Sequence, residues 1–153
     1  MSKINPYARF AAMVIASTVV MFGLMYLNTY EVEHVFFSET RAYMAVVMGA
    51  AMAMTMLGFM LHMLKNRQAN IAILIVGTLV FSAALWLVRS QATVGDVSYM
   101  KAMIPHHSIA IMTSRRAQIT DPRVRKLADG IAETQVREIA EMKGLIEDLA
   151  GKR

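Results

Sequence analysis

The stretch AYMAVVMGAAMAMTMLGFMLHML, residues 42–64, contains 23 residues and no charged side chain. Two further uncharged stretches of 21 residues cover residues 10–30 and 68–88. A bilayer core about 30 Å thick needs roughly 20 apolar residues of helix. The sequence therefore predicts three transmembrane helices, because the 65 residues from 89 to 153 are too few to bury three such helices in a soluble core.

The composition agrees with a membrane protein. Apolar residues make up 56% of the chain and charged residues only 18%. The first uncharged stretch follows Lys3 and Arg9, as in a signal peptide, but it is too long for one and no small-x-small cleavage site follows Leu27. We expect an uncleaved anchor and a membrane domain of residues 1–88.

The flanking charges predict the orientation. Lys3 and Arg9 precede the first predicted span, Lys65 and Arg67 lie between the second and third, and the segment between the first and second is acidic. Because Lys and Arg stay on the cytoplasmic side, the N-terminus should be cytoplasmic and residues 89–153 extracytoplasmic. Arg89 alone runs against this pattern. In a bacterium the predicted location is the inner membrane.

Two helical stretches make up the predicted extracytoplasmic domain, residues 89–153. The first begins near Asp96, a candidate N-cap, and runs to about Ser114. The second opens with Asp121-Pro122, an N-cap followed by Pro at the first helical position, and runs to about Leu149 before a stop at Gly151. The short turn between them predicts an antiparallel hairpin, so the fold class is all-α.

Two helices bury too little apolar surface to be stable alone. The hairpin should pack either on a second copy, which gives a four-helix bundle in a homodimer, or on its own membrane helices. With the turn centred on Thr120, a straight-helix register places Met103 across from Glu138 and Tyr99 across from Met142.

The run Met103-Ile104-Pro105-His106-His107 is the most informative motif. Adjacent His residues on a helix point about 100° apart, so one should face the hairpin interior while the other points elsewhere. Pro105 should kink or restart the helix, because it lacks a backbone N–H.

Donor chemistry narrows the choice of metal. Glu138 lies in an apolar stripe, where a buried carboxylate needs a partner or a metal. Imidazole and thioether donors in a chain without Cys favour copper over zinc or calcium. A di-iron site is less expected, because neither helix contains a Glu-x-x-His pair. A satisfied polar His and a core Met remain the simpler structural interpretation of these residues.

The two motifs resemble the family called domain of unknown function 305. The first match is the Met103–His107 run with Ala110 and Met112, and the second is a Gln-x-x-Glu-Ile-x-x-Met pattern over residues 135–142. The resemblance implies a ferritin-like fold, and some members are periplasmic copper-binding proteins. It implies a copper ion as cofactor, with candidate ligands Met103, His106, His107, Glu138 and Met142.

Two other metal-binding patterns are open to simpler explanations. Met residues recur every four positions from Met44 to Met60, which suits either passage of Cu(I) through the membrane or adaptable helix packing, and we favour packing. Glu31, Glu33 and His34 suit either weak binding of a divalent ion or a solvated acidic loop, and we favour the loop.

The sequence thus predicts a membrane-anchored copper-binding protein for sequestration, tolerance or delivery of the metal, and not an enzyme. The alternatives are a structural or interaction module whose hairpin docks a partner, and a redox enzyme that uses the same metal. Membrane lipid, a metal ion and a second copy are the expected partners. Nucleic acid is not expected, because the positive charges form no dense stripe.

Overall fold

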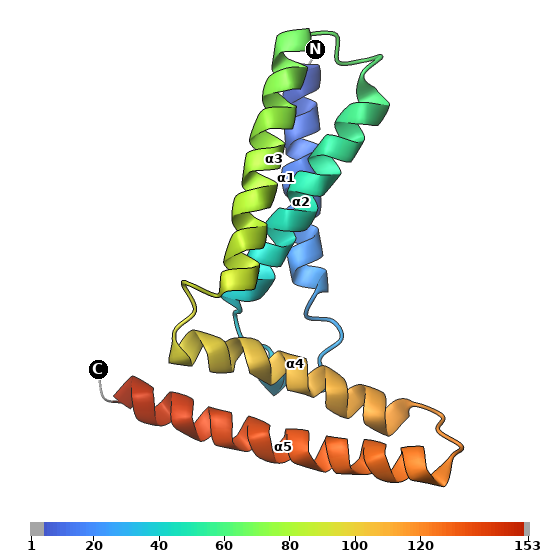
Figure 1. Ribbon diagram of the computed structural model, residues 1–153, viewed down its shortest axis with the longest axis vertical. Helices are drawn as coiled ribbons and strands as arrows, with labels where there is room; N and C mark the ends of the chain where they lie inside the picture. The colour runs from blue at the N-terminus through green and yellow to red at the C-terminus, as the bar shows by residue number, and fades with distance from the viewer. Residues whose placement is uncertain (1–4, 152–153) are drawn as a thin grey trace. The chain divides into compact units, whose positions relative to one another are not determined.

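The structure is a computed structural model that describes residues 5–151. Within these residues the chain is entirely helical, which confirms the all-α prediction at this level. The elements are α1 (Pro6–Leu24), the 3₁₀ helix η1 (Val32–His34), α2 (Glu39–Met60), α3 (Arg67–Ser90), α4 (Asp96–Arg116) and α5 (Pro122–Gly151) (Figure 1). They form two compact units, one built on α1–α3 and one on η1, α4 and α5.

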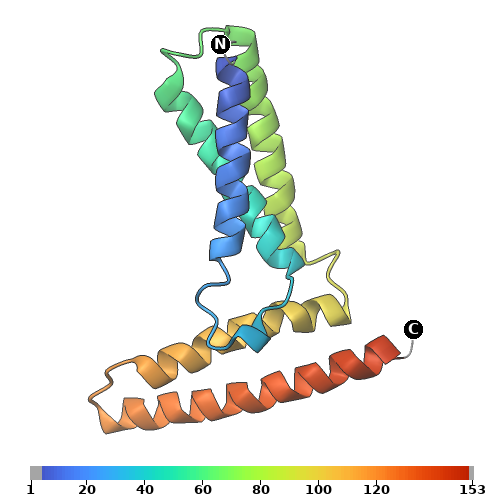
Figure 2. The same ribbon diagram turned by 180° about the vertical axis from the view of Figure 1, so that it is seen from behind.

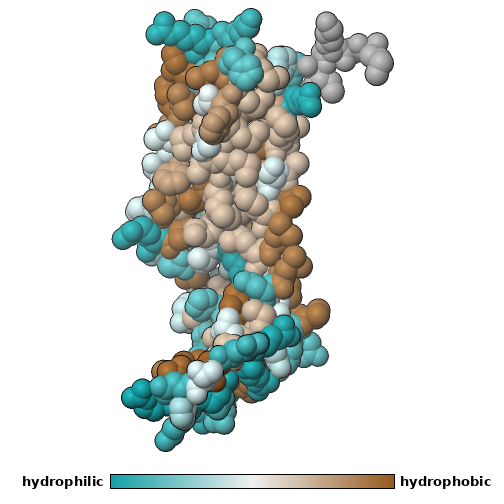
Figure 3. Space-filling model, turned by 90° about the vertical axis from the view of Figure 1, so that its right-hand side faces the viewer, coloured by the Kyte–Doolittle hydropathy of each residue, from teal (hydrophilic) through white to brown (hydrophobic). Residues whose placement is uncertain are grey.

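The helices α1, α2 and α3 are each long enough and apolar enough to cross a membrane, judged by length and composition. Their outward-facing side chains are mostly apolar, and in Figure 3 the surface over these helices is coloured in hydrophobic tones along most of its length. α1 begins at Pro6, four residues before the predicted start, because the Asn5 side chain caps it by accepting the N–H of Tyr7 at 2.9 Å. It ends at Leu24 and not at residue 30, since residues from Tyr26 belong to the second unit.

Small residues allow these helices to approach closely. Gly49 of α2 lies against the Thr18 side chain of α1, so a Cβ at position 49 would clash with the hydroxyl. Gly77 of α3 lies in the same way against Met54 of α2. The helix–helix contacts in this unit therefore depend on the absence of side chains at two positions.

A polar cluster joins α1 to the α2–α3 connection. The Tyr7 hydroxyl accepts the backbone N–H of Asn66 at 2.9 Å and donates to Asn70 Oδ1 at 3.0 Å. Asn70 Nδ2 in turn donates to the carbonyl of Leu64 at 2.7 Å. These bonds pair polar groups beside the apolar cluster of Phe10, Leu57 and Leu64.

The methionines of α2 do not share one environment. Met56 and Met60 pack against the buried cluster around Leu57, Met54 lies against Gly77 of α3, and Met44 is exposed. The contacts described here, with an apolar cluster and with a neighbouring helix, are those of helix packing.

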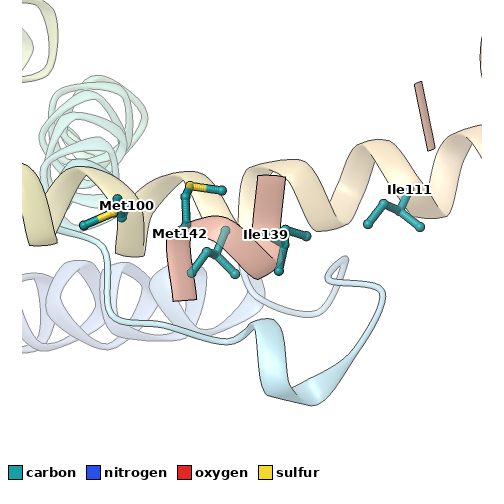
Figure 4. Close-up of a cluster of buried hydrophobic side chains, with 5 residues drawn as sticks. Met100, Ile111, Ile139 and Met142 are labelled. Atoms are coloured by element: carbon teal, nitrogen blue, oxygen red, sulfur yellow. The ribbon is translucent and has the colours of Figure 1, made fainter. Parts of the chain in front are cut away.

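In the second unit, α4 and α5 run side by side in opposite directions, joined by a short connection (Figures 1 and 2). Apolar side chains from the two helices meet between them (Figure 4); the buried members are Met100, Ile104, Ile111, Ile139 and Met142. Asp121 Oδ1 accepts the N–H of Arg123 at 2.8 Å and Pro122 opens α5, as predicted.

Two local predictions for this unit, the N-cap of α4 and the end of α5, were wrong, and of the kink or restart predicted at Pro105 the restart was wrong. The N-cap of α4 is Gly95 and not Asp96, which is already helical. Pro105 does not restart α4, which continues from Asp96 to Arg116 with the proline buried inside it. Ile104 and Ile111, on either side of the proline, both belong to the buried cluster that α4 forms with α5. Gly151 does not stop α5 before it, since the helix includes Gly151.

The segment between α1 and α2 belongs to the α4–α5 unit. Residues 26–39 cluster with residues 94–151, although the predicted boundary placed them in a domain of residues 1–88. The Ser108 hydroxyl of α4 accepts the N–H of Tyr30 at 2.7 Å and lies 3.0 Å from His34 Nδ1. Tyr30 and Phe36 pack against the α4–α5 core. This segment therefore covers part of the apolar surface that α4 and α5 do not bury against each other. We call residues 26–39 the covering segment.

We expect Gly49→Ala to lower the free energy of unfolding of the α1–α3 unit by about 1–3 kcal/mol, because the new methyl group overpacks against Thr18. Denaturation of the full chain in detergent, followed by circular dichroism, measures this change. Gly58→Ala in the same helix is the control, since a Cβ added at position 58 would meet nothing within 4 Å. Equal stability of the two variants would contradict the packing argument.

We expect Ser108→Ala to release the covering segment, because the N–H of Tyr30 and the ring of His34 both lose their partner. Amide hydrogen exchange of residues 30–35 should accelerate about tenfold, for a loss of about 1.4 kcal/mol. Thr113→Ala is the control, because the Thr113 hydroxyl bonds to carbonyls of its own helix, those of Ile109 and Ala110. Unchanged exchange in Ser108→Ala would show that the two hydrogen bonds do not hold the segment.

Candidate metal centre

A groove of about 420 Å³ runs along α4 and α5 and brings together donors of several chemical kinds. Imidazole, carboxylate and two thioethers line it. The lining residues are Asp96, Tyr99, Met100, His107, Glu138, Glu141, Met142 and Leu145.

His107 and Glu138 form the polar centre of this groove. His107 Nδ1 lies 3.2 Å from Glu138 Oε2, and Gln135 Nε2 donates to the same oxygen at 3.3 Å. The His107 side chain is mostly buried, whereas that of Glu138 is 44% exposed. The carboxylate therefore connects a buried ring to the open side of the groove.

The surroundings of His107 favour the neutral form of its imidazole. Burial lowers the pKa of His107 below its ordinary value, the nearby Glu138 carboxylate opposes this, and His106 adds a smaller lowering. Among the described residues, Nδ1 of His107 is also a buried side-chain atom without a hydrogen-bond partner, since the contact with Glu138 is short but not aligned as a hydrogen bond. A neutral ring nitrogen without a hydrogen bond is the form in which histidine binds metals.

Two buried thioethers lie beside the imidazole. Met142 comes from α5, and Met100 lies seven positions before His107, two turns along the same face of α4. Met100 was not among the predicted ligands. The same spacing of seven would have found it, had the search extended beyond the Met103–His107 motif.

The structure brings together three of the five predicted ligands and separates the other two. His107, Glu138 and Met142 share the groove. His106 is exposed, with its ring centroid 6.4 Å from that of His107 and the ring planes tilted by 55°. Met103 is half-buried and packs against the core, but does not line the groove.

The predicted pairing of Met103 with Glu138 is one helical turn away from the observed contact. Glu138 contacts His107, four positions further along α4. Side chains tilt toward the N-terminus of their helix, so in an antiparallel pair the tilts of positions 107 and 138 bring the two side chains together. The straight-helix register considered backbone positions alone.

His34 in the covering segment lies outside this groove. Its ring is buried, with Nδ1 at Ser108 and Nε2 3.5 Å from Glu31, and burial lowers the pKa of His34. Glu33 points instead to Lys143, at 3.7 Å. The segment is therefore docked and not simply solvated. Among residues 5–151 no group of three or more His, Asp or Glu side chains is arranged to hold a metal.

The C-terminal part of the chain is similar to a known protein family. Residues 90–153 match the family described as Domain of unknown function (DUF305), which supports the resemblance seen in the two motifs for this segment. An uncharacterized protein of Acanthamoeba polyphaga mimivirus is 35% identical over 77 residues, which is 49% of this chain and 51% of that protein. The chain thus spans about half the length of this relative. No solved structure matches the chain.

Neither comparison supplies an enzymatic activity: the family description states no function, and the viral relative is called uncharacterized.

We expect Glu138→Gln to lower the pKa of His107 further, because the carboxylate is the group that raises it. The proton affinity of the ring falls when the adjacent negative charge is removed. NMR titration of the imidazole protons in the metal-free full chain measures the change. Glu141→Gln is the control, since Glu141 lines the groove but is not among the groups that shift His107. A His107 pKa that stays constant or rises in Glu138→Gln would contradict the assigned contact.

Proposed function

We propose that the chain is a membrane protein whose α4–α5 unit binds copper on the extracytoplasmic side, for sequestration, tolerance or delivery of the metal. The observation that carries this proposal is the mostly buried His107 imidazole, its pKa lowered by burial, which shares a groove with two thioethers and three carboxylates. With no Cys in the sequence, imidazole and thioether donors suit Cu(I), whereas imidazole and carboxylate suit Cu(II).

Each donor has a distinct role in this proposal. His107 supplies the nitrogen ligand through Nδ1, and Met100 and Met142 supply the sulfur ligands for Cu(I). Glu138 offers an oxygen at the open side of the groove, where copper enters. His106, on the preceding position of α4, is exposed and does not line the groove, so it is not a ligand in this proposal.

The membrane location is proposed from the three apolar helices and the charges that flank them. Lys65, between α2 and α3, and Arg67, the first residue of α3, favour a cytoplasmic position for that connection. The segment after α3 then lies on the opposite side, as does the covering segment between α1 and α2. Both parts of the second unit are therefore available in the same compartment, which in a bacterium is outside the inner membrane.

We expect the full chain in lipid nanodiscs to bind copper stoichiometrically in competition with a chromophoric chelator. His107→Ala should weaken binding more than about 100-fold, beyond the effect of losing an outer-shell group, and His106→Ala less than about tenfold. Met100→Leu and Met142→Leu should weaken Cu(I) binding more than Cu(II) binding, because thioethers select the softer ion. Met103→Leu is the matched control, since Met103 lies on α4 outside the groove.

Two outcomes would contradict the copper proposal. If the chain bound no more copper than His107→Ala, the groove would be a structural polar pair, and the protein an interaction module. If Met103→Leu lost as much Cu(I) affinity as Met100→Leu, the site would lie elsewhere on α4. Unchanged hydrogen exchange of the covering segment in each variant shows that the fold is intact.

A further inference from the structure

The covering segment is held on the second unit partly through a buried histidine. His34 is 6% exposed, and the Ser108 side chain that it contacts on α4 is fully buried. His34 is also the only histidine of residues 26–39. Imidazole is the side chain that changes its charge near neutral pH when its surroundings do not shift it. The contacts of this ring can therefore respond to pH where those of carboxyl and phenol groups do not.

The hydrogen bonds around His34 fit the neutral ring. The N–H of Tyr30 donates to Ser108 Oγ at 2.7 Å, which leaves the hydroxyl its own proton to donate. His34 Nδ1 lies 3.0 Å from the same oxygen and accepts that proton only while Nδ1 carries none. In the neutral ring the proton is then on Nε2, which faces Glu31 Oε2 at 3.5 Å. Both ring nitrogens thus have a suitable neighbour in the neutral form.

A second proton, on Nδ1, disturbs this arrangement. Nδ1 becomes a donor, so Ser108 Oγ has to accept from both the ring and Tyr30, and its own proton loses the acceptor that the neutral ring provides. The positive charge also lies on a ring that is almost completely removed from water, and burial disfavours the charged form of histidine. Protonation therefore favours a segment that has left α4, because the ring and the hydroxyl then both reach water.

The charged groups that face His34 act in both directions. Burial is the largest influence and lowers the pKa of His34, the Glu31 carboxylate raises it, Lys143 of α5 lowers it, and Glu33 raises it. The result is a pKa below the ordinary value. A histidine with a lowered pKa in the docked state stabilises docking fully above its ordinary pKa, and this contribution is lost as the pH falls.

Further contacts of the covering segment with α4 and α5 join groups that keep their charge state near neutral pH. They are the contacts of Arg115 and Arg116 with Tyr30, of Lys143 with Glu33, and of Ser98 with Glu39. Carboxylate, ammonium, guanidinium and phenol groups ordinarily titrate outside the range in which histidine does. Mild acid therefore acts on the docking of this segment through His34.

We propose that the covering segment is a pH-dependent switch of the α4–α5 unit, docked while His34 is neutral and released when its ring is protonated. Release withdraws Tyr30 and Phe36 from the core that contains Met100 and Met142. Acid would therefore loosen the packing around the two thioethers of the candidate metal centre. The switch goes beyond the proposed function and operates without bound copper, so each proposal can fail without the other.

Hydrogen exchange of residues 30–35 in the metal-free full chain, in nanodiscs, tests the switch. Each rate is divided by the intrinsic rate of an unprotected peptide at the same pH, which gives a protection factor. From about pH 7.5 to about pH 5.0 we expect protection to fall at least about threefold, with a ceiling of about 30-fold for a released ring of ordinary pKa, about 6.5. α3, in the other unit, is the internal reference and should keep its protection.

His34→Asn separates this ring from the other titrating groups. Asn keeps an acceptor oxygen for the Ser108 hydroxyl but does not titrate, so protection should change less than about twofold between the two pH values. His106→Asn is the matched control, because His106 is exposed, and it should show the full fall of the wild type. Equal wild-type protection at both pH values would overturn the proposal. So would a fall in His34→Asn as large as that of the wild type, since another group would then be responsible.

Two charge variants decide the question if His34→Asn does not dock even at neutral pH. Glu31→Gln removes a group that favours the protonated docked ring, so its fall in protection should exceed that of the wild type. Lys143→Gln removes a group that disfavours the protonated ring, so its fall should be smaller. A purely structural effect would lower protection at both pH values and leave the fall unchanged. Equal falls in these two variants would overturn the proposal.

Discussion

In a pair of helices each helix can bury only the face that it turns toward the other. The α4–α5 unit therefore needs further side chains to cover its remaining apolar surface. The buried core between them is small, with Ile104 and Ile111 as its most enclosed members. The chain supplies the missing cover from the connection between α1 and α2, through Tyr30 and Phe36. One hydroxyl, that of Ser108, contacts both Tyr30 and His34 of that connection, and Glu33 adds an ion pair with Lys143. The helix that carries the candidate metal centre is therefore held from two sides.

Most of the helical architecture could be predicted from the sequence, because uncharged runs and capping residues act locally. Asp121-Pro122 predicted the start of α5, and the second and third uncharged stretches located α2 and α3 to within a few residues. The covering segment could not be predicted, because its contacts join residues 74 and 78 positions apart and its own composition is that of an acidic loop. No local pattern indicates that Ser108 accepts a backbone N–H from so far away.

The kinds of donor side chain in the candidate site could be predicted from the sequence, but not every residue that lines the groove. The pattern of His, Met and Glu identified His107, Glu138 and Met142, which share the groove. It also included His106 and Met103, since a sequence motif is contiguous whereas a helix face takes every third or fourth residue. Met100 lies on that face but outside the motif. Side-chain tilt, which shifts the contact of Glu138 by one turn, follows from helix geometry and needs no homologue to be seen.

The covering segment also constrains the order in which the protein is made. It leaves the ribosome long before its binding surface on α4, and at 5–20 residues per second a separation of 74 residues corresponds to roughly 4–15 seconds. During that interval Tyr30, His34 and Phe36 have no α4 to pack against. The two parts of the second unit are therefore separated in the sequence and are synthesised at different times. Its folding begins only after α3, which separates its two parts, has been synthesised.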